Sequence, residues 1–139
     1  MRRMSDIVKD RKPLLLPGHT TVQHACRSMR ERRVGAVVVT GADRRLLGIF
    51  TGRDAVCRVL AEGKDPAKTT LAEVMTRDPY TMPPANTAIE ALRTMEDCGC
   101  RHLPVVEDEK VIGIASRGDF RGIELDRLDE ETGIWERIA

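Results

Sequence analysis

The spacing of apolar positions predicts two amphipathic helices, one in each half of the chain. Apolar side chains at positions 22, 25, 26 and 29 follow an i, i+3, i+4, i+7 pattern, which gathers them on one helical face. Positions 88, 91, 92 and 95 repeat that face. Thr20 or Thr21 supplies an N-cap oxygen for the first helix. We expect this helix to end near Val34-Gly35 and the second near Gly99, because glycine favours helix termination.

Valine-rich runs predict the strands. Residues 35–39 and 102–106 form such runs, and residues 46–50 and 111–115 are their expected hairpin partners. Pro104 predicts an edge or bulged position for the second run. The remaining expected elements are short leading helices at 4–9 and 70–75, extended pieces at 14–16 and 80–82, and helices at 54–62 and 119–128. Each half therefore reads strand, helix, strand, strand, helix, which predicts an α/β (α+β) fold.

The two halves are copies of one unit. A shift of 66 positions pairs Pro13 with Pro79 and Met29 with Met95, and the shift drops to 65 after Thr40, inside a polar turn that tolerates a deletion. We predict unit 1 at residues 1–65, unit 2 at residues 66–128, and a short amphipathic tail helix at residues 129–139. The long period of the repeat favours two half-domains that face each other. A solenoid array is disfavoured, because its repeats have shorter periods.

One phrase recurs at the same place in both units. Residues 48–54 and 113–119 each read glycine, two apolar residues, a hydroxyl residue, two spacers and an aspartate. Thr51 with Asp54, and Ser116 with Asp119, have the spacing of a helix capping box. The same arrangement also suits a nucleotide: a helix start attracts phosphate, and an aspartate accepts from both hydroxyls of a ribose. Both interpretations stay open from the residues alone.

Composition and charge narrow the function classes. The net charge is +1, from 23 basic and 22 acidic residues, which argues against nucleic-acid binding by bulk charge. No apolar run is long enough to span a membrane and no secretory signal is visible, so we expect a cytoplasmic protein without a membrane partner. We expect reduced cysteines, with a redox role for Cys98 and Cys100 as the alternative. Neither a catalytic constellation nor a metal cluster is recognisable.

With these features, the chain resembles a tandem pair of CBS domains, also called a Bateman module, over about residues 5–128. The resemblance implies a pseudo-two-fold pair of units with two clefts between them, where AMP, ADP, ATP, NAD or S-adenosylmethionine binds. It implies that Asp54 and Asp119 hold the ribose and that Thr51 and Ser116 contact ribose or phosphate. The residues expected near the base are Leu14, Val34, Ala36, Val37, Tyr80, Arg101, His102 and Pro104.

The two expected clefts are not equivalent. Arg53 and Arg117 both lie within the repeated turns, where they are candidate phosphate ligands, but at different positions of the phrase. Ala36 aligns with His102, which adds a second asymmetry beside the base. We therefore expect the cleft of the second phrase to be the better polyphosphate site, with Arg117, Arg101 and His102 nearby.

The predicted function is a non-catalytic sensor that is not attached to a catalytic domain and signals by conformational or assembly change. AMP or ATP is the expected ligand, with NAD and S-adenosylmethionine as further candidates. A homodimer is expected from the resemblance, with an unknown downstream protein as partner. The alternative is a structural or oligomerisation module without a ligand, in which the repeated phrases act only as helix caps.

Overall fold

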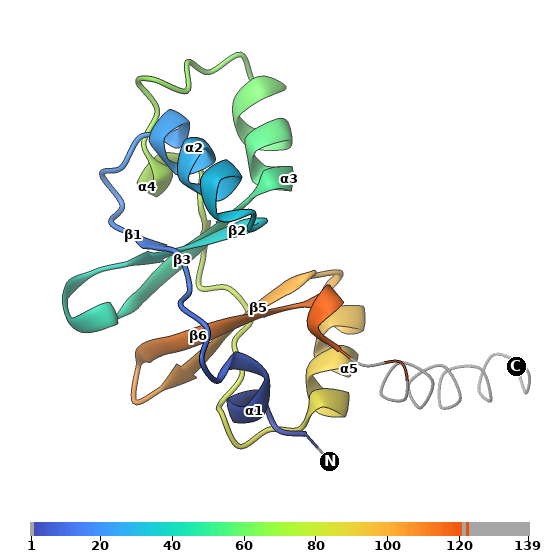
Figure 1. The fold of residues 1–139 in the computed structure, drawn as a ribbon. Coiled ribbons are helices and arrows are strands. Elements are labelled where there is room, and N and C mark those ends of the chain that lie inside the picture. Colours follow the sequence, from blue (N-terminus) through green and yellow to red (C-terminus); the bar gives the residue numbers. More distant parts are fainter. Residues whose placement is uncertain (1, 121, 123–139) are drawn as a thin grey trace, which may run out of the picture.

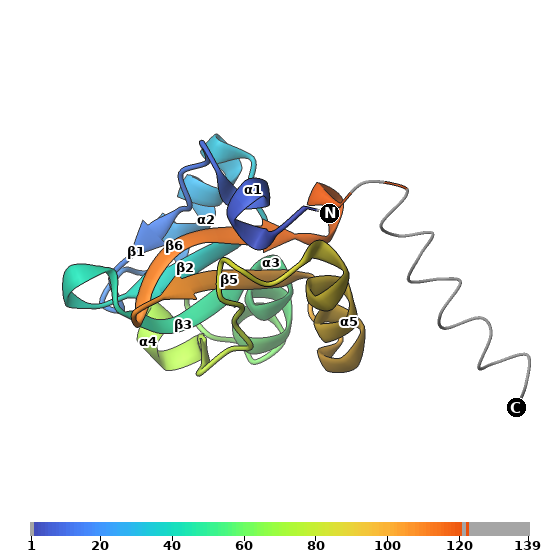
Figure 2. The ribbon, with the colours of Figure 1, turned by 90° about the horizontal axis from the view of Figure 1, so that it is seen from below.

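The chain folds into two stacked β-sheets covered on their outer faces by helices. The structure is a computed structural model that describes residues 2–120 and 122. Helices α2, α3 and α4 lie outside the first sheet, and α1 and α5 lie outside the second (Figures 1 and 2). The expected α+β fold with two repeated units is therefore confirmed. Within the described residues, no helix has both the length and the apolar character needed to cross a bilayer.

The first sheet has four strands in the order β1-β2-β3-β4. Strand β1 (Leu15–Leu16) runs parallel to β2 (Ala36–Thr40), and β3 (Leu46–Thr51) runs antiparallel to β2. The fourth strand, β4 (Thr76–Arg77), comes from the second half of the chain and pairs with Gly48 and Ile49. The predicted hairpin of the first unit is thus present, with a short 3-10 turn, η1 (Ala42–Arg44), at its tip.

The second sheet repeats this plan in reduced form. Strands β5 (His102–Glu107) and β6 (Lys110–Ser116) make the predicted second hairpin, closed by a two-residue turn. Met82 pairs with Val105 in a parallel bridge, where the first sheet has β1. Pro104 belongs to β5, which lies between Met82 and β6, so it is not on an edge strand. The expected irregularity is present one residue further on, where the register shifts between Val105 and Val106. The two hairpin turns differ in length, which accounts for the change in repeat register.

The two amphipathic helices begin as predicted. In α2 (Val22–Arg32) the side chain of Thr21 accepts from the backbone N–H of His24 at 3.2 Å, and in α5 (Ala88–Cys98) Thr87 accepts from Glu90 at 3.3 Å. Helix α2 ends earlier than expected, because Arg33 already has the left-handed conformation with φ 54°. Gly99 ends α5 in the same way, with φ 66°.

The repeated phrase starts a continuous helix in unit 1 but only a short turn in unit 2. Helix α3 (Gly52–Asp54) continues as η2 (Ala55–Leu60), which has π-helical hydrogen bonding. In the second unit the phrase forms the 3-10 turn η3 (Arg117–Asp119), which ends at Phe120 because the backbone there is extended, with φ −89° and ψ 141°. The helix expected from residue 119 therefore does not begin there. The remainder of the expected helix at 119–128 and the expected tail helix at 129–139 lie outside the described residues, apart from 119, 120 and 122.

The short leading helix of each unit packs in the hydrophobic core of the other unit. Helix α1 (Met4–Val8) packs in the core formed by α5, β5 and β6, where Met4 is fully buried with Leu92 and Leu103. Helix α4 (Leu71–Val74) packs in the core formed by α2, β2 and β3, where Leu71 is fully buried with Phe50. Hence residues 9–13 and 76–81 both cross from one core to the other.

The exchanged helices explain the glycine that opens each repeated phrase. A Cβ atom at Gly113 would lie 2.6 Å from Val8 Cβ, at the end of α1. A Cβ atom at Gly48 would lie 2.7 Å from both Met75 Sδ and the Thr76 backbone oxygen, just after α4. Only a residue without a side chain allows these segments to approach the sheets so closely.

We predict that Gly48→Ala and Gly113→Ala each destabilise the fold by about 1–3 kcal/mol, the range for overpacking a filled core. Chemical denaturation followed by circular dichroism measures this loss. Gly52→Ala is the matched control, because a Cβ there meets no atom within 4 Å. Equal stability of the control and the two test variants would contradict the close-approach explanation.

Candidate functional site

Two clefts lie between the units, and each contains one of the repeated phrases. The Asp119 cleft has a volume of about 420 Å³, and the Asp54 cleft has a volume of about 700 Å³. Both volumes fall within the ~300–1,000 Å³ range typical of small-molecule sites. The sequence-based expectation of two clefts therefore corresponds to two real concavities in the fold.

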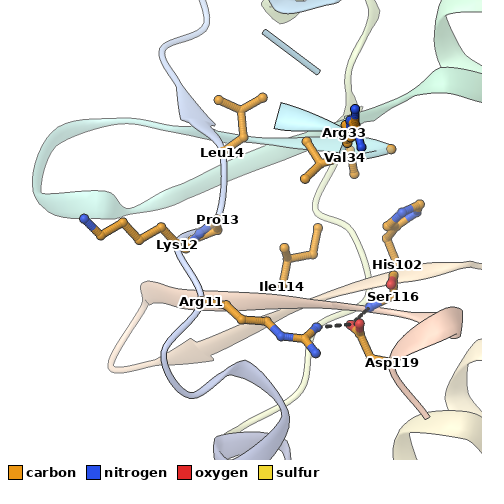
Figure 3. Close-up of a pocket in the computed structure, with 12 residues that line it drawn as sticks. Arg11, Lys12, Pro13, Leu14, Arg33, Val34, His102, Ile114, Ser116 and Asp119 are labelled. Carbon is orange, nitrogen blue, oxygen red and sulfur yellow. Dashed lines mark hydrogen bonds and ion pairs between the residues drawn. The ribbon is translucent and has the colours of Figure 1, made fainter. Parts of the chain in front are cut away.

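The walls of each cleft come from both units. The Asp119 cleft combines the crossing segment and the start of β2 from unit 1 with β6 and the second phrase (Figure 3). Its lining residues are Arg11, Lys12, Pro13, Leu14, Arg33, Val34, Gly35, Ala36, His102, Ile114, Ser116 and Asp119. The Asp54 cleft has the reverse arrangement. Its lining residues are Gly35, Ile49, Thr51, Gly52, Arg53, Asp54, Thr76, Asp78, Pro79, Tyr80, Cys98, Gly99, Cys100, Arg101 and His102.

In the Asp54 cleft, the aspartate caps its own helix with one oxygen. Asp54 Oδ2 accepts from the Thr51 backbone N–H at 2.9 Å and from the Thr51 hydroxyl at 3.2 Å. The other oxygen, Oδ1, lies 3.5 Å from Arg58 Nε. Arg58 Nη1 also donates to the Val74 and Met75 carbonyls at 3.3 and 3.1 Å, so it links Asp54 to the end of α4.

Asp119 is held in a closely similar way. Its Oδ2 accepts from the Ser116 backbone N–H at 2.7 Å, and its Oδ1 forms an ion pair with the Arg11 guanidinium. Figure 3 shows Arg11 extending from the crossing segment toward this carboxylate. Because Arg11 donates its backbone N–H to Val8 at 3.2 Å, this arginine is tied to the end of α1. In both clefts, therefore, an arginine connects the motif aspartate to an exchanged helix.

His102 lies in the wall between the clefts and lines both of them. A Cβ at Gly35, which also lines both clefts, would lie 3.3 Å from His102 Nε2. Burial lowers the pKa of His102 below its ordinary value of 6.5, and the nearby Arg101 charge lowers it further, while Asp119 opposes the shift. The imidazole is consequently neutral at neutral pH.

Three of the expected site residues are not part of either lining. The Arg117 guanidinium lies 3.6 Å from Glu96 on α5, and Arg101 lines the Asp54 cleft, so the polyphosphate group expected around Arg117 and Arg101 is not assembled in the Asp119 cleft. Val37 is fully buried in the first core because strand alternation turns it toward the helices. Pro104 is buried in β5, where its carbonyl accepts from Met82 at 3.1 Å.

Several lining residues were missed by the sequence reasoning. Arg11 and Lys12 were missed because a crossing segment has no periodic pattern, and Arg33 was missed because a cation at the polar end of an amphipathic helix is ordinarily solvated. The repeat could have indicated these residues. A shift of 66 aligns Lys12 with Asp78 and Arg33 with Gly99, and the members of each pair lie at the rims of opposite clefts.

The expectation of reduced cysteines is corrected by the structure, in which Cys98 and Cys100 form a disulfide. The left-handed turn at Gly99 brings their Cα atoms to 5.2 Å, within the range that a disulfide requires. The pair lies in the wall of the Asp54 cleft. Cys26 and Cys57 are free. Among the described residues, no group of three or more His, Cys, Asp or Glu side chains is placed to hold a metal ion.

Comparisons with known proteins agree with this architecture. The family model of the CBS domain matches residues 4–60 and again residues 71–126. "CBS domain-containing protein CBSCBSPB3" of Arabidopsis thaliana is 45% identical over 103 residues, which is 74% of this chain but only 18% of that protein. "Hypoxic response protein 1" of Mycobacterium tuberculosis is 38% identical over 103 residues, 73% of this chain and 71% of the relative.

Two solved structures are similar over most of the chain. A CBS domain protein from Pyrobaculum aerophilum complexed with AMP superposes with a TM-score of 0.81 at 26% identity, covering 92% of this chain and 98% of that one. Hypoxic Response Protein I with two coordinated zinc ions has a TM-score of 0.73 at 31% identity, covering 84% of this chain and 94% of that one.

The lowered pKa of His102 predicts a specific pH dependence. Because the unfolded chain binds this proton more readily than the folded chain does, the stability contributed by neutral His102 is present above pH 6.5. It declines as the pH falls from 6.5 through the lowered folded-state pKa. Thermal melts from pH 7.5 to 5 should therefore show a steeper loss in the wild type than in His102→Gln. Parallel curves would show that burial does not suppress this protonation.

Proposed function

The chain belongs to the CBS domain family, and from this membership and its two clefts we propose that it is a non-catalytic regulatory module for adenosine-containing ligands. AMP, ADP or ATP is the proposed ligand, with NAD and S-adenosylmethionine as further candidates. We further propose that the module acts in the cytoplasm and that a separate protein receives its signal. CBS-pair proteins are regulatory modules, which is the general role that family membership supports.

The proposal rests on one observation, which is that each cleft is lined by residues from both units. In each cleft, the turn of one unit that contains the hydroxyl residue and the aspartate lies beside segments of the other unit that lead into its strands. Thr51 and Asp54 face Tyr80 and Arg101, while Ser116 and Asp119 face Leu14 and other residues of unit 1. A nucleoside fits such a pair of surfaces, since its sugar needs acceptor oxygens and its base needs an apolar slot with backbone partners.

The capping geometry leaves part of each aspartate for a ligand. Oδ2 of Asp54 and of Asp119 is committed to a backbone N–H of its own turn. Oδ1 of each carboxylate is turned to an arginine, at 3.5 Å in the case of Arg58. A ribose hydroxyl can donate to Oδ1 without breaking the cap, because a carboxylate has about four lone-pair sites. Capping and ribose binding thus use different atoms of one side chain.

Ligand identity is supported by a neighbour and limited by the donor atoms present. The Pyrobaculum aerophilum protein is complexed with AMP, which favours an adenine nucleotide here. The zinc ions of the hypoxic response protein do not transfer by the same argument, because no described group of residues is arranged for a metal. We therefore propose a nucleotide, and not a metal ion, as the regulatory ligand.

The arginines offer a route from ligand to conformation. Arg58 holds the carbonyls at the end of α4 while it faces Asp54, and Arg11 follows α1 while it pairs with Asp119. A ligand that takes Oδ1 of either aspartate competes with these pairs. It therefore binds the conformers that differ in these contacts with different affinity, which is the requirement for a population shift.

One observation favours the alternative of a structural module without a ligand. Both phrases form complete capping boxes, so the hydroxyl and carboxylate already have partners within the turn. On that alternative the aspartates serve only stability. The two possibilities make different predictions for the same pair of variants.

We predict that Asp54→Ala and Asp119→Ala each weaken nucleotide binding by about 1.5–3 kcal/mol, because a hydrogen bond to a charged group is lost. This corresponds to a roughly ten- to hundredfold rise in Kd. Because each aspartate lines only one of the two clefts, each variant should weaken binding at one site and leave the other site unchanged. Isothermal titration calorimetry with AMP, ATP, NAD and S-adenosylmethionine measures both the affinity and the number of sites.

Asp97→Ala is the matched control, since it removes an exposed carboxylate of α5 that lines neither cleft. It should leave both sites intact. If well-folded wild-type protein binds none of the four ligands below millimolar concentration, the sensor proposal fails. If Asp54→Ala and Asp119→Ala lower the melting temperature while ligand affinity is unchanged, the two aspartates act only as helix caps and do not hold the ligand.

We also propose a homodimer that uses the outer surface of η2. Val56 and Leu60 lie one turn apart on this helix and are 57% and 68% exposed. An exposed apolar stripe of this kind is typical of an interaction surface. A second copy of the chain would bury it without obstructing the clefts, because neither residue lines them.

The dimer proposal predicts that Leu60→Glu lowers the subunit count, because it places a charge in an apolar contact. Native mass spectrometry, which also reports any co-purified small molecule, is the measurement. Glu62→Gln is a control on the exposed turn that follows η2. A wild-type monomer at micromolar concentration, or a Leu60→Glu dimer as stable as the wild type, would contradict the proposed interface.

A further inference from the structure

The two clefts carry different charges at equivalent positions of the repeat. Lys12 on the rim of the Asp119 cleft corresponds to Asp78 on the rim of the Asp54 cleft, and Arg33 corresponds to Gly99. The Asp119 cleft is lined by three cationic side chains and one carboxylate. The Asp54 cleft is lined by two cationic side chains and two carboxylates. The first cleft is therefore the more electropositive of the two, even when Arg58 beside Asp54 is counted as a third cation of the second.

Arg33 has a backbone conformation that normally favours glycine. It ends α2 with φ 54° and ψ 45°, and its N–H donates to the carbonyls of Arg30 and Met29. Gly99 ends α5 with φ 66° and ψ 24° and the same pair of backbone bonds. An L-residue is disfavoured in the left-handed region, so glycine would suit this helix end better. Arg33 therefore places a guanidinium at the rim of the Asp119 cleft, where the equivalent Gly99 of the Asp54 cleft has no side chain.

Arg11 supplies a second cation on the opposite side of this cleft. Its guanidinium pairs with Asp119 Oδ1, and about half of the side chain is exposed. Because a guanidinium has five N–H donors, Arg11 can contact a phosphate oxygen while it remains near the aspartate. In Figure 3, Arg11 and Arg33 lie on opposite sides of the cleft, with Ile114 between them. Lys12 lies at the rim and extends away from Asp119.

We propose that the clefts sort adenosine ligands by charge: the Asp119 cleft takes a nucleoside di- or triphosphate, and the Asp54 cleft takes an adenosine ligand with at most one phosphate. Arg33 and Arg11 are the specificity-determining cations of the first site. In the Asp54 cleft, Asp78 repels additional phosphates. The inference rests on the proposed nucleotide function. The phosphate-binding role that the sequence analysis expected of Arg117 is assigned to cations from unit 1.

Single-site proteins test the sorting directly. Asp54→Ala leaves the Asp119 cleft, and Asp119→Ala leaves the Asp54 cleft. Calorimetry should show ATP binding at least tenfold more tightly than AMP to the Asp54→Ala protein, with the order reversed in the Asp119→Ala protein. The ATP affinity of the Asp119 cleft should also fall more steeply with added salt, because exposed charges are screened.

Arg33→Gly separates binding from folding. In the Asp54→Ala background it should weaken ATP about tenfold and leave AMP nearly unchanged, while the melting temperature stays level or rises, because glycine suits the left-handed cap. Arg11→Gln should likewise weaken ATP more than AMP. Arg30→Gln, an equal charge change on an exposed part of α2 outside both clefts, should change neither affinity.

A gain-of-function variant completes the test. Asp78→Lys in the Asp119→Ala background should bring ATP affinity up to or above that of AMP. Equal ATP-to-AMP ratios in the two single-site proteins, or an unchanged ratio in Arg33→Gly, would overturn the sorting while leaving nucleotide sensing intact. If wild-type protein binds neither nucleotide, the proposed function fails and the sorting fails with it.

Discussion

The exchange of two short helices between the cores organises the rest of this structure. Met4 and Leu71 are fully buried in the core of the opposite unit, so the chain must cross between layers twice. The crossing segments at 9–13 and 76–81 supply lining residues on one side of each cleft, including Arg11 and Tyr80. Burial of a few apolar side chains thus fixes where the concave surfaces form. Gly48 and Gly113 allow it, because a side chain at either position would collide with the incoming segment.

Helix capping and the proposed ligand recognition use different oxygen atoms of each motif aspartate. One oxygen of each aspartate completes a helix cap, and the other is directed to an arginine that is connected to an exchanged helix. The cap fixes the position of the carboxylate, which would reduce the ordering cost of the proposed ribose binding. Under the proposed function, the two interpretations of the phrase would involve different oxygen atoms of the same side chain.

Local features of the fold were predictable from sequence, and features set by tertiary packing were not. The apolar spacing of α2 and α5, the Thr21 cap and the two hairpins depend on residues close together along the chain, and all of them are present. Eleven of the fourteen expected site residues line a cleft, because the repeat places them at strand ends and helix starts. Their contact with a ligand stays a prediction. Arg117 points to Glu96 instead, since its position in the phrase differs from that of Arg53.

The helix exchange also has a consequence for how such a chain arises. A fragment that stopped after residue 65 would keep α1, which belongs in the other core, and would lack α4, which closes its own. Two identical fragments would satisfy both needs only by trading α1 across a symmetric pair. The tandem chain is thus equivalent to an intertwined dimer joined by a peptide linker. Joining the copies lets equivalent positions differ, as Lys12 and Asp78 do with their opposite charges.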